Sequence, residues 1–222
     1  MVYEISRLIV RLALRALYGF RVDGGDREPP AGPLLIVSNH VSDLDPLVVG
    51  AALRRHVRFM AKVELFRPPL LRWWLRACGA FPVRRGEVDR QAFRTARTIL
   101  DQGGALVMFP EGTRASSLLD IRPAEPGAAL LALRTGAVIL PVAVIGTDRV
   151  LPKGAHRPAR GTIRIRIGDP IRINGAVGDI GRGRPERERV DSVGRHFMDE
   201  IAQMLKGADS SGMESPGRHV EH

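Results

Sequence analysis

The chain has little cysteine: Cys78 is the single thiol among 222 residues. One cysteine excludes an internal disulfide and any zinc site built from several thiolates. Because Cys78 stands in an apolar stretch, we expect a small core residue rather than a nucleophile. A chain of this length with 44% hydrophobic residues can bury one ordinary core, so we expect a single folded domain.

Long hydrophobic runs are also missing, and no stretch approaches the roughly 18–20 apolar residues of a membrane-spanning helix. The segment MVYEISRLIVRLALRALYGF carries Arg7, Arg11 and Arg15 at four-residue spacing, on one face of a helix. A signal peptide instead concentrates its charge before an unbroken apolar region. We predict that residues 1–20 form an interfacial amphipathic helix with its cations toward lipid headgroups. The alternative is a helix packed on the core with its arginines in water.

Lysine and aromatic residues are scarce, whereas arginine is abundant. The sequence has three lysines among 34 basic residues, 24 acidic residues and a net charge of +10. This charge favours an anionic partner, which is a nucleic acid, a membrane surface or a phosphorylated substrate, and it is equally expected of a protein from an arginine-rich proteome. Aromatic residues make up 5%, and no basic helix carries stacking partners, which argues against nucleic acid.

Apolar runs typical of buried strands alternate with segments of helical periodicity. Extended segments are predicted at residues 33–38, 57–61, 80–86, 105–110, 137–146 and 161–171. Helices are predicted at residues 46–53, within 64–79, and at 88–101, 127–135 and 193–205. This alternation predicts an α/β fold: a mixed, largely parallel sheet flanked by helices.

The remaining segments are rich in turn-forming or charged residues. Residues 21–32 are expected to be a connector and residues 181–190 a charged linker. Residues 207–222 have the composition of a disordered tail. The predicted organisation is therefore an amphipathic helix over 1–20, one domain over 21–206 and a tail.

Chemistry-bearing residues follow the first buried strand, in the stretch SNHVSDLDP. A histidine acts as a general base when its neutral tautomer points one nitrogen at the proton to be removed, and a carboxylate on the other nitrogen fixes that tautomer. Asp45 stands where a loop-to-helix turn returns its side chain to His40, and it also suits the helix N-cap. The alternative is that Asn39, Ser42 and Asp45 only organise a turn.

A second group follows another buried strand, in the stretch FPEGTRA. Gly112 allows a close approach of the backbone, Thr113 supplies a hydroxyl, and Arg114 supplies a guanidinium. This set suits a phosphate, because arginine makes bidentate charge-assisted hydrogen bonds and backbone amides add dipoles. The alternative is a glycine turn with a solvated ion pair between Glu111 and Arg114.

Three further patterns are weak by themselves. Residues 79–86, GAFPVRRG, place two arginines after a short extended segment, and residues 139–147, ILPVAVIGT, form an apolar strand containing Pro141. Asp43 and Asp45 match the Asp-x-Asp pattern of metal-dependent glycosyltransferases, which would leave the histidine and the FPEGTR stretch unexplained.

In order and spacing, these stretches together resemble the 1-acyl-sn-glycerol-3-phosphate (lysophosphatidic acid) acyltransferases, over about residues 33–170. The family pattern of Asn-His, four residues and Asp is matched by Asn39, His40 and Asp45. Its other motifs are matched by the extended segment ending at Arg85, by Phe-Pro-Glu-Gly-Thr-Arg at 109–114, by the strand around Pro141, and by an Ala-Lys-x-Glu-Leu segment that includes Lys62.

The resemblance implies transfer of a fatty acyl group from acyl-CoA or acyl carrier protein to the hydroxyl of a lysophospholipid, without a cofactor or metal. It implies that His40 is the base and Asp45 its partner. The acceptor phosphate would be oriented by Arg85, Glu111, Gly112, Thr113 and Arg114. Supporting roles would fall to Asn39, Ser42, Lys62 and Pro141.

The resemblance also implies a peripheral enzyme on the cytoplasmic face of the cell membrane, in contact with anionic lipids. Trp73 and Trp74 suit the headgroup level or core packing, with at least one expected to be buried. Leu70 and Leu71 are candidates to line an acyl groove. The chain departs from the family in having Glu125 where a cation is often found and Arg84 where an acid is frequent, and both changes bear on the choice of acceptor.

Overall fold

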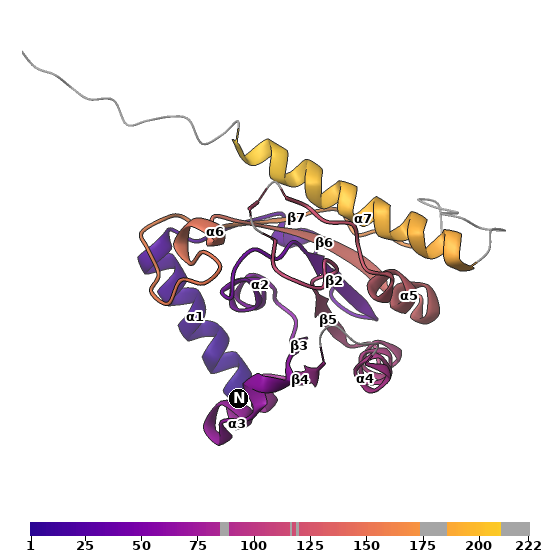
Figure 1. Cartoon of the computed structure of the whole chain (residues 1–222), viewed down its shortest axis with the longest axis horizontal. Helices are drawn as coiled ribbons and strands as arrows, with labels where there is room; N and C mark the ends of the chain where they lie inside the picture. Colours follow the sequence, from indigo (N-terminus) through magenta and orange to yellow (C-terminus); the bar gives the residue numbers. More distant parts are fainter. Residues whose placement is uncertain (85–88, 116, 119, 174–185, 210–222) are drawn as a thin grey trace, which may run out of the picture.

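The computed structural model describes residues 1–84, 89–115, 117–118, 120–173 and 186–209 (Figure 1). The elements in chain order are α1 (Val2–Tyr18), β1 (Arg21–Asp23), η1 (Gly25–Arg27), β2 (Leu34–Ser38), α2 (Asp45–Ala52), β3 (Val57–Lys62), η2 (Val63–Phe66), α3 (Pro69–Ala77), β4 (Ala80–Val83), α4 (Arg90–Asp101), β5 (Ala105–Met108), α5 (Pro126–Thr135), β6 (Val138–Ile145), α6 (Thr147–Val150), β7 (Arg164–Ile167) and α7 (Glu186–Asp209).

Within the described residues, seven strands form one sheet in the order β1-β7-β6-β2-β5-β3-β4. Strands β6 and β7 are antiparallel, and every other neighbouring pair is parallel. The prediction of an α/β fold with a mixed, largely parallel sheet is confirmed. Because β2 lies between β5 and β6 and is parallel to both, the carboxyl ends of these three strands meet at one edge of the sheet.

Helices cover both faces of this sheet, which is why β2 is apolar at every position up to its last residue. Helices α1 and α2 lie on one face, and α4, α5 and α7 lie on the other (Figure 1). Along β2, Leu34 and Ile36 pack in the first layer, whereas Leu35 and Val37 pack in the second. Successive side chains of a strand point to opposite faces, so each residue of β2 enters a core.

Two boundaries differ from those predicted. The expected connector 21–32 contains the edge strand β1, whose Arg21 pairs with Arg164 of β7. Helix α7 begins at Glu186, inside the expected linker, and continues to Asp209. Its Phe197 is fully buried, so the helix belongs to the core of the domain. The other residues of the predicted linker and the tail from 210 onward lie outside the described residues.

Helix α1 packs on the core through Tyr3 and Leu14, and Arg15 is exposed, as the alternative arrangement predicts, but Arg7 differs from it. The Arg7 guanidinium is turned toward the body of the domain, where it donates to the carbonyls of Leu53 (2.8 Å) and Arg54 (2.9 Å). The apolar residues Leu8 and Ile9 are exposed instead. Among the described residues, no helix is both long enough and apolar enough to span a membrane.

Candidate active site at the carboxyl edge of the sheet

The loop after β2 is fastened to the neighbouring strand β6 by the first residue beyond the strand. The Asn39 amide donates through Nδ2 to the Val144 carbonyl (2.9 Å) and accepts the Val144 N–H on Oδ1 (2.8 Å). These two hydrogen bonds satisfy a backbone unit of β6 and fix where the loop leaves the sheet. Asn39 thereby positions the residue that follows it, His40.

His40 and Asp45 form a buried pair, as the spacing predicted. His40 Nδ1 lies 2.8 Å from Asp45 Oδ2, and the two residues are 3% and 0% exposed. The same Oδ2 accepts the backbone N–H groups of Val41 and Ser42, and Oδ1 accepts the hydroxyl of Thr147 at 2.6 Å. Asp45 therefore has four hydrogen-bond donors, and it orients His40 through Nδ1.

The predicted helix cap at Asp45 is wrong in detail. Asp45 is the first residue of α2, Leu44 occupies the N-cap, and no side chain caps the helix. The carboxylate of Asp45 instead turns back to the amides of the loop that precedes it. Ser42 completes this loop, since its Oγ donates to the Leu151 carbonyl (2.7 Å) and accepts from the Leu44 N–H (3.2 Å).

The FPEGTR loop after β5 clamps the His40 backbone from the other side. The Glu111 carboxylate accepts the His40 N–H (3.0 Å), and the His40 carbonyl accepts the Ala115 N–H (2.8 Å). The Phe109 ring stacks on the imidazole with a centroid distance of 4.3 Å. Glu111 is 5% exposed, so its carboxylate supports His40 and is not turned to an acceptor phosphate as predicted.

Arg114 pairs with a residue that the sequence did not indicate. Its Nη1 lies 2.6 Å from Oδ2 of Asp43, so neither a free guanidinium nor the alternative pair with Glu111 is observed. Gly112 has φ of 68°, its N–H donates to the Phe109 carbonyl, and a Cβ there would overlap the Glu125 carboxyl group. The positive φ therefore favours glycine at this turn.

The other predicted site residues have different placements. Lys62 is exposed at the end of β3 and lines the same cavity as His40, whereas Thr113 is exposed beside Arg114. Pro141 is buried in β6 opposite Val37 and supports the strand rather than the cavity. Arg85 lies outside the described residues.

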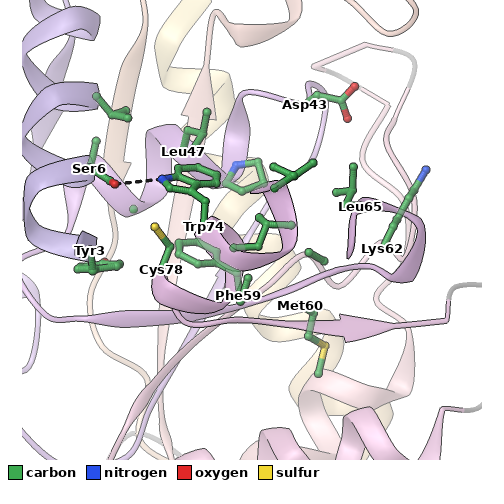
Figure 2. Close-up of a pocket in the computed structure, with 18 of the residues that line it drawn as sticks. Tyr3, Ser6, Asp43, Leu47, Phe59, Met60, Lys62, Leu65, Trp74 and Cys78 are labelled. Atoms are coloured by element: carbon green, nitrogen blue, oxygen red, sulfur yellow. Dashed lines mark hydrogen bonds between the residues drawn. The ribbon is translucent and has the colours of Figure 1, made fainter. Parts of the chain in front are cut away.

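A cavity of about 560 Å³ opens beside His40, and most of its wall is apolar. Figure 2 shows Asp43 and Lys62 at one end of it and Tyr3 and Ser6 of α1 at the other. Leu71 lines the cavity as predicted, but Leu70 is 78% exposed and does not. The remaining wall comes from α1, α2, β3, η2 and the segment of α3 with its C-cap, including Val10, Leu47, Gly50, Phe59, Met60, Leu65, Trp74, Leu75 and Cys78.

The two tryptophans have different surroundings, and neither is buried. Trp73 is 59% exposed, which makes the prediction of at least one buried tryptophan wrong. Trp74 lines the cavity, and its Nε1 donates to Ser6 Oγ (3.1 Å), so it joins α3 to α1 (Figure 2). Cys78 also lines the cavity, and burial raises the pKa of its thiol, which disfavours the reactive thiolate.

Thr147 is the site residue that sequence reasoning missed. It is fully buried at the start of α6, directly after β6, and donates to Asp45. The available signal was positional: a hydroxyl residue immediately follows the strand that adjoins β2. Gly146, with φ of 90°, makes the turn that delivers it.

The geometry does not favour the Asp-x-Asp alternative. Both oxygens of Asp45 are occupied by donors and shielded from solvent, whereas Asp43 is exposed on Arg114. A metal bridge needs both carboxylates to reach one ion. No group of three or more potential metal-ligating side chains occurs among the described residues.

Comparisons with known proteins agree with one another. The family model described as Acyltransferase matches residues 19–145. The chain is 27% identical to the chloroplastic 1-acyl-sn-glycerol-3-phosphate acyltransferase of Arabidopsis thaliana, covering 79% of this chain and 49% of that protein. It is 33% identical to the 1-acyl-sn-glycerol-3-phosphate acyltransferase of Streptococcus pneumoniae, covering 63% and 50%. The chain thus spans about half the length of these relatives.

A solved structure shares the fold. The crystal structure of the 1-acyl-sn-glycerophosphate acyltransferase of Thermotoga maritima superposes with a TM-score of 0.77 at 23% identity, covering 94% of this chain and 80% of that one. The likeness therefore extends beyond residues 19–145 to nearly the whole chain.

Burial raises the pKa of the Glu111 carboxyl above its ordinary value, and the His40 N–H opposes this shift. A raised carboxyl pKa means that folding favours the protonated form. The contribution of the protonated Glu111 carboxyl to the free energy of unfolding is complete below the ordinary pKa of the group, about 4.5. It is lost as the pH rises through the raised value.

We therefore expect Glu111→Gln, which retains an acceptor for the His40 N–H, to gain stability relative to the unsubstituted protein as the pH rises from 4 to 7. Urea unfolding at a series of pH values measures this difference. Glu125→Gln, which removes an exposed carboxyl from the same loop, is the control. A stability difference between Glu111→Gln and the unsubstituted protein that stays constant with pH would contradict a raised pKa of Glu111.

Proposed function

The chain belongs to the acyltransferase family, and we propose that it transfers a fatty acyl group from a thioester to the free hydroxyl of 1-acyl-glycerol-3-phosphate, giving phosphatidic acid. The observation that carries this proposal is the buried His40–Asp45 pair at the wall of an apolar cavity, beside Arg114. This combination offers a base, a place for an alkyl chain and a cation for a phosphate. The relatives' names support the choice of acceptor.

His40 is the general base in the proposed mechanism. With Nδ1–H donating to Asp45, the lone pair of the other ring nitrogen, Nε2, accepts the proton of the acceptor hydroxyl. The hydroxyl oxygen attacks the thioester carbon and a tetrahedral intermediate forms. When the carbon–sulfur bond breaks, the imidazolium returns the proton to the departing sulfur. The acceptor oxygen is itself the nucleophile, so no acyl-enzyme bond is formed.

Asp45 stabilises the imidazolium that exists during this transfer. Its carboxylate is held by donors on both sides, which prevents it from rotating away as the charge on His40 changes. Thr147 is part of this support, because its hydroxyl fixes the oxygen that does not face His40. The site thus supplies orientation and a preformed counter-charge.

Arg114 is the proposed ligand of the acceptor phosphate, with Thr113 and the Gly112 turn beside it and Lys62 at the same cavity mouth. Arg85 remains a proposed phosphate ligand from the family pattern alone. Arginine binds a phosphate through paired hydrogen bonds, so it fixes orientation as well as charge. Glu111 acts indirectly in this scheme, by holding the His40 backbone.

The apolar cavity is the proposed place of an acyl chain. It is lined by residues of α1, α2, β3, η2 and α3, and His40 is one of its lining residues. The acyl donor is acyl-CoA or acyl carrier protein, and the proposed reaction needs no cofactor or metal. Both donors are cytoplasmic thioesters, which is consistent with action at the cytoplasmic face of the cell membrane.

Helices α1 and α3 form the proposed membrane-docking surface. Their exposed apolar residues are Ile5, Leu8, Ile9, Leu12, Leu17, Leu70 and Trp73. The hydrogen bond between Trp74 and Ser6 joins the two helices. Exposed apolar surface of this extent on a basic protein fits the interface of a membrane with anionic lipids.

Replacing His40 by Ala is expected to lower kcat by about 10²- to 10⁴-fold, the usual contribution of a general base. The measurement is thiol release from palmitoyl-CoA and oleoyl-CoA with lysophosphatidic acid in detergent, repeated with acyl carrier protein as donor. His196→Ala, on α7 across the sheet, is the matched control and should retain activity.

A panel of other acceptors completes this test. Activity that depends on His40 but requires another lyso-lipid or a glycolipid would retain the mechanism and change the acceptor. Near-normal activity of a folded His40→Ala variant would refute the mechanism, and no activity with any donor and acceptor would refute the proposed function.

Thr147→Val removes the hydroxyl that supports Asp45 while keeping a similar shape. Hydrogen bonds to charged groups contribute about 1.5–3 kcal/mol, so we expect kcat to fall at least tenfold with little change in KM. Thr147→Ser retains the hydroxyl and should retain most activity. A folded Thr147→Val variant with an unchanged kcat would show that Asp45 needs no such support.

The two tryptophans allow the membrane proposal to be tested site by site. In Trp74→Phe, the remaining Trp73 should shift its fluorescence to shorter wavelength on vesicles with anionic lipids and be quenched by brominated acyl chains. In Trp73→Phe, the remaining Trp74 should respond much less on vesicles made of diacyl lipids alone, because it lines the cavity and no lyso-lipid or thioester is present to fill that cavity. Vesicle binding without quenching of Trp73 would place the membrane on another surface.

A further inference from the structure

The Arg114 guanidinium is not free to bind the phosphate of an acceptor, because it is already paired with the Asp43 carboxylate. The Arg114 Nη1–Asp43 Oδ2 distance is 2.6 Å, and the two side chains are 19% and 70% exposed. Both residues line the cavity together with His40. A carboxylate of this chain therefore lies on the guanidinium at the cavity mouth, next to the proposed base.

The two partners differ in how firmly they are held. The residue after Arg114 is tied to the catalytic loop, since the Ala115 N–H donates to the His40 carbonyl, and the Arg114 carbonyl accepts from Lys153 Nζ at 3.5 Å. Among the described residues, the Asp43 side chain hydrogen-bonds to Arg114, and it is 70% exposed. Asp43 is thus the partner that can leave.

We propose that Asp43 holds the place of the acceptor's phosphate on Arg114 in the empty enzyme, so that an acceptor reaches the guanidinium only by displacing a carboxylate of the protein itself. This inference rests on the proposed function. A phosphate monoester carries a charge of about −1.5 to −2 near neutral pH and offers three terminal oxygens, so it displaces a carboxylate from a guanidinium. A phosphodiester headgroup with a single negative charge competes less well, and a neutral headgroup does not compete.

Asp43 therefore weakens the binding of every acceptor that needs Arg114, because each must break the same ion pair. The correct acceptor binds less tightly than it would to an unpaired arginine. Exposed ion pairs are weak, so this loss is small.

Asp43→Asn tests the competition directly. Removing the carboxylate should lower KM for lysophosphatidic acid about two- to five-fold with kcat nearly unchanged, as expected for loss of a weak competing ion pair. The ratio of kcat/KM for lysophosphatidic acid to that for lysophosphatidylglycerol should stay nearly constant, because both acceptors must break the same ion pair. Asp101→Asn, which breaks the exposed pair with Arg97 on α4, is the matched control and should change neither quantity.

A double substitution shows whether Asp43 acts through Arg114. In an Arg114→Gln background, Asp43→Asn should no longer lower KM, because the guanidinium for which carboxylate and phosphate compete is gone. An unchanged or raised KM in the single variant would overturn the proposal. A raised KM would mean that Asp43 orients Arg114 for the acceptor.

Binding without turnover separates this proposal from the proposed function. Glycerol 3-phosphate, titrated by calorimetry, should bind Asp43→Asn about two- to five-fold more tightly than the unsubstituted protein. Equal affinities would refute the competition whether or not the enzyme turns over lysophosphatidic acid. Tighter binding with no turnover of any lyso-lipid would support the competition and refute the proposed reaction.

Discussion

The site depends on the hydrogen bonds that surround the buried carboxylate of Asp45. A charged group without solvent contact is costly unless donors surround it. Here the donors come from the loop after β2 and from Thr147, which lies 102 positions further along the chain. The parallel pairing of β2 with β6 brings these segments together. The orientation of His40 is therefore a property of the whole sheet and not of one loop.

Sequence reasoning succeeded where the determinants are local. A strand buried on both faces reads as an unbroken apolar run, which located β2, β5 and β6, and the His40–Asp45 spacing fits within a single turn. It failed where the partner comes from another segment. No local sequence pattern identifies Thr147 as a partner of Asp45. The partner of Arg114 depends on how two loops pack together. The three-residue strand β1 is too short for its alternation to be recognised.

The orientation of α1 illustrates a second limit. Helical periodicity reveals two faces but not which of them meets the domain. Arg7 donates to the carbonyls of Leu53, the C-cap residue of α2, and of Arg54, which follows it. These hydrogen bonds turn Arg7 inward, while Leu8 and Ile9 are exposed. The inward position of Arg7 thus depends on backbone carbonyls at the end of a neighbouring helix, which helical periodicity alone does not reveal.

Helix α1 has a cavity on one side and the exterior on the other. Tyr3, Ser6 and Val10 line the cavity, while Leu8 and Leu12 face outward. An alkyl chain that enters water loses about 0.8 kcal/mol for each methylene. In the proposed docking of α1 on a lipid leaflet, an alkyl chain that passes around this helix moves from the hydrocarbon of the bilayer to the apolar cavity and avoids that loss. Chain length would then be sensed through the shape of the cavity, and the headgroup would govern the equilibrium between bilayer and protein.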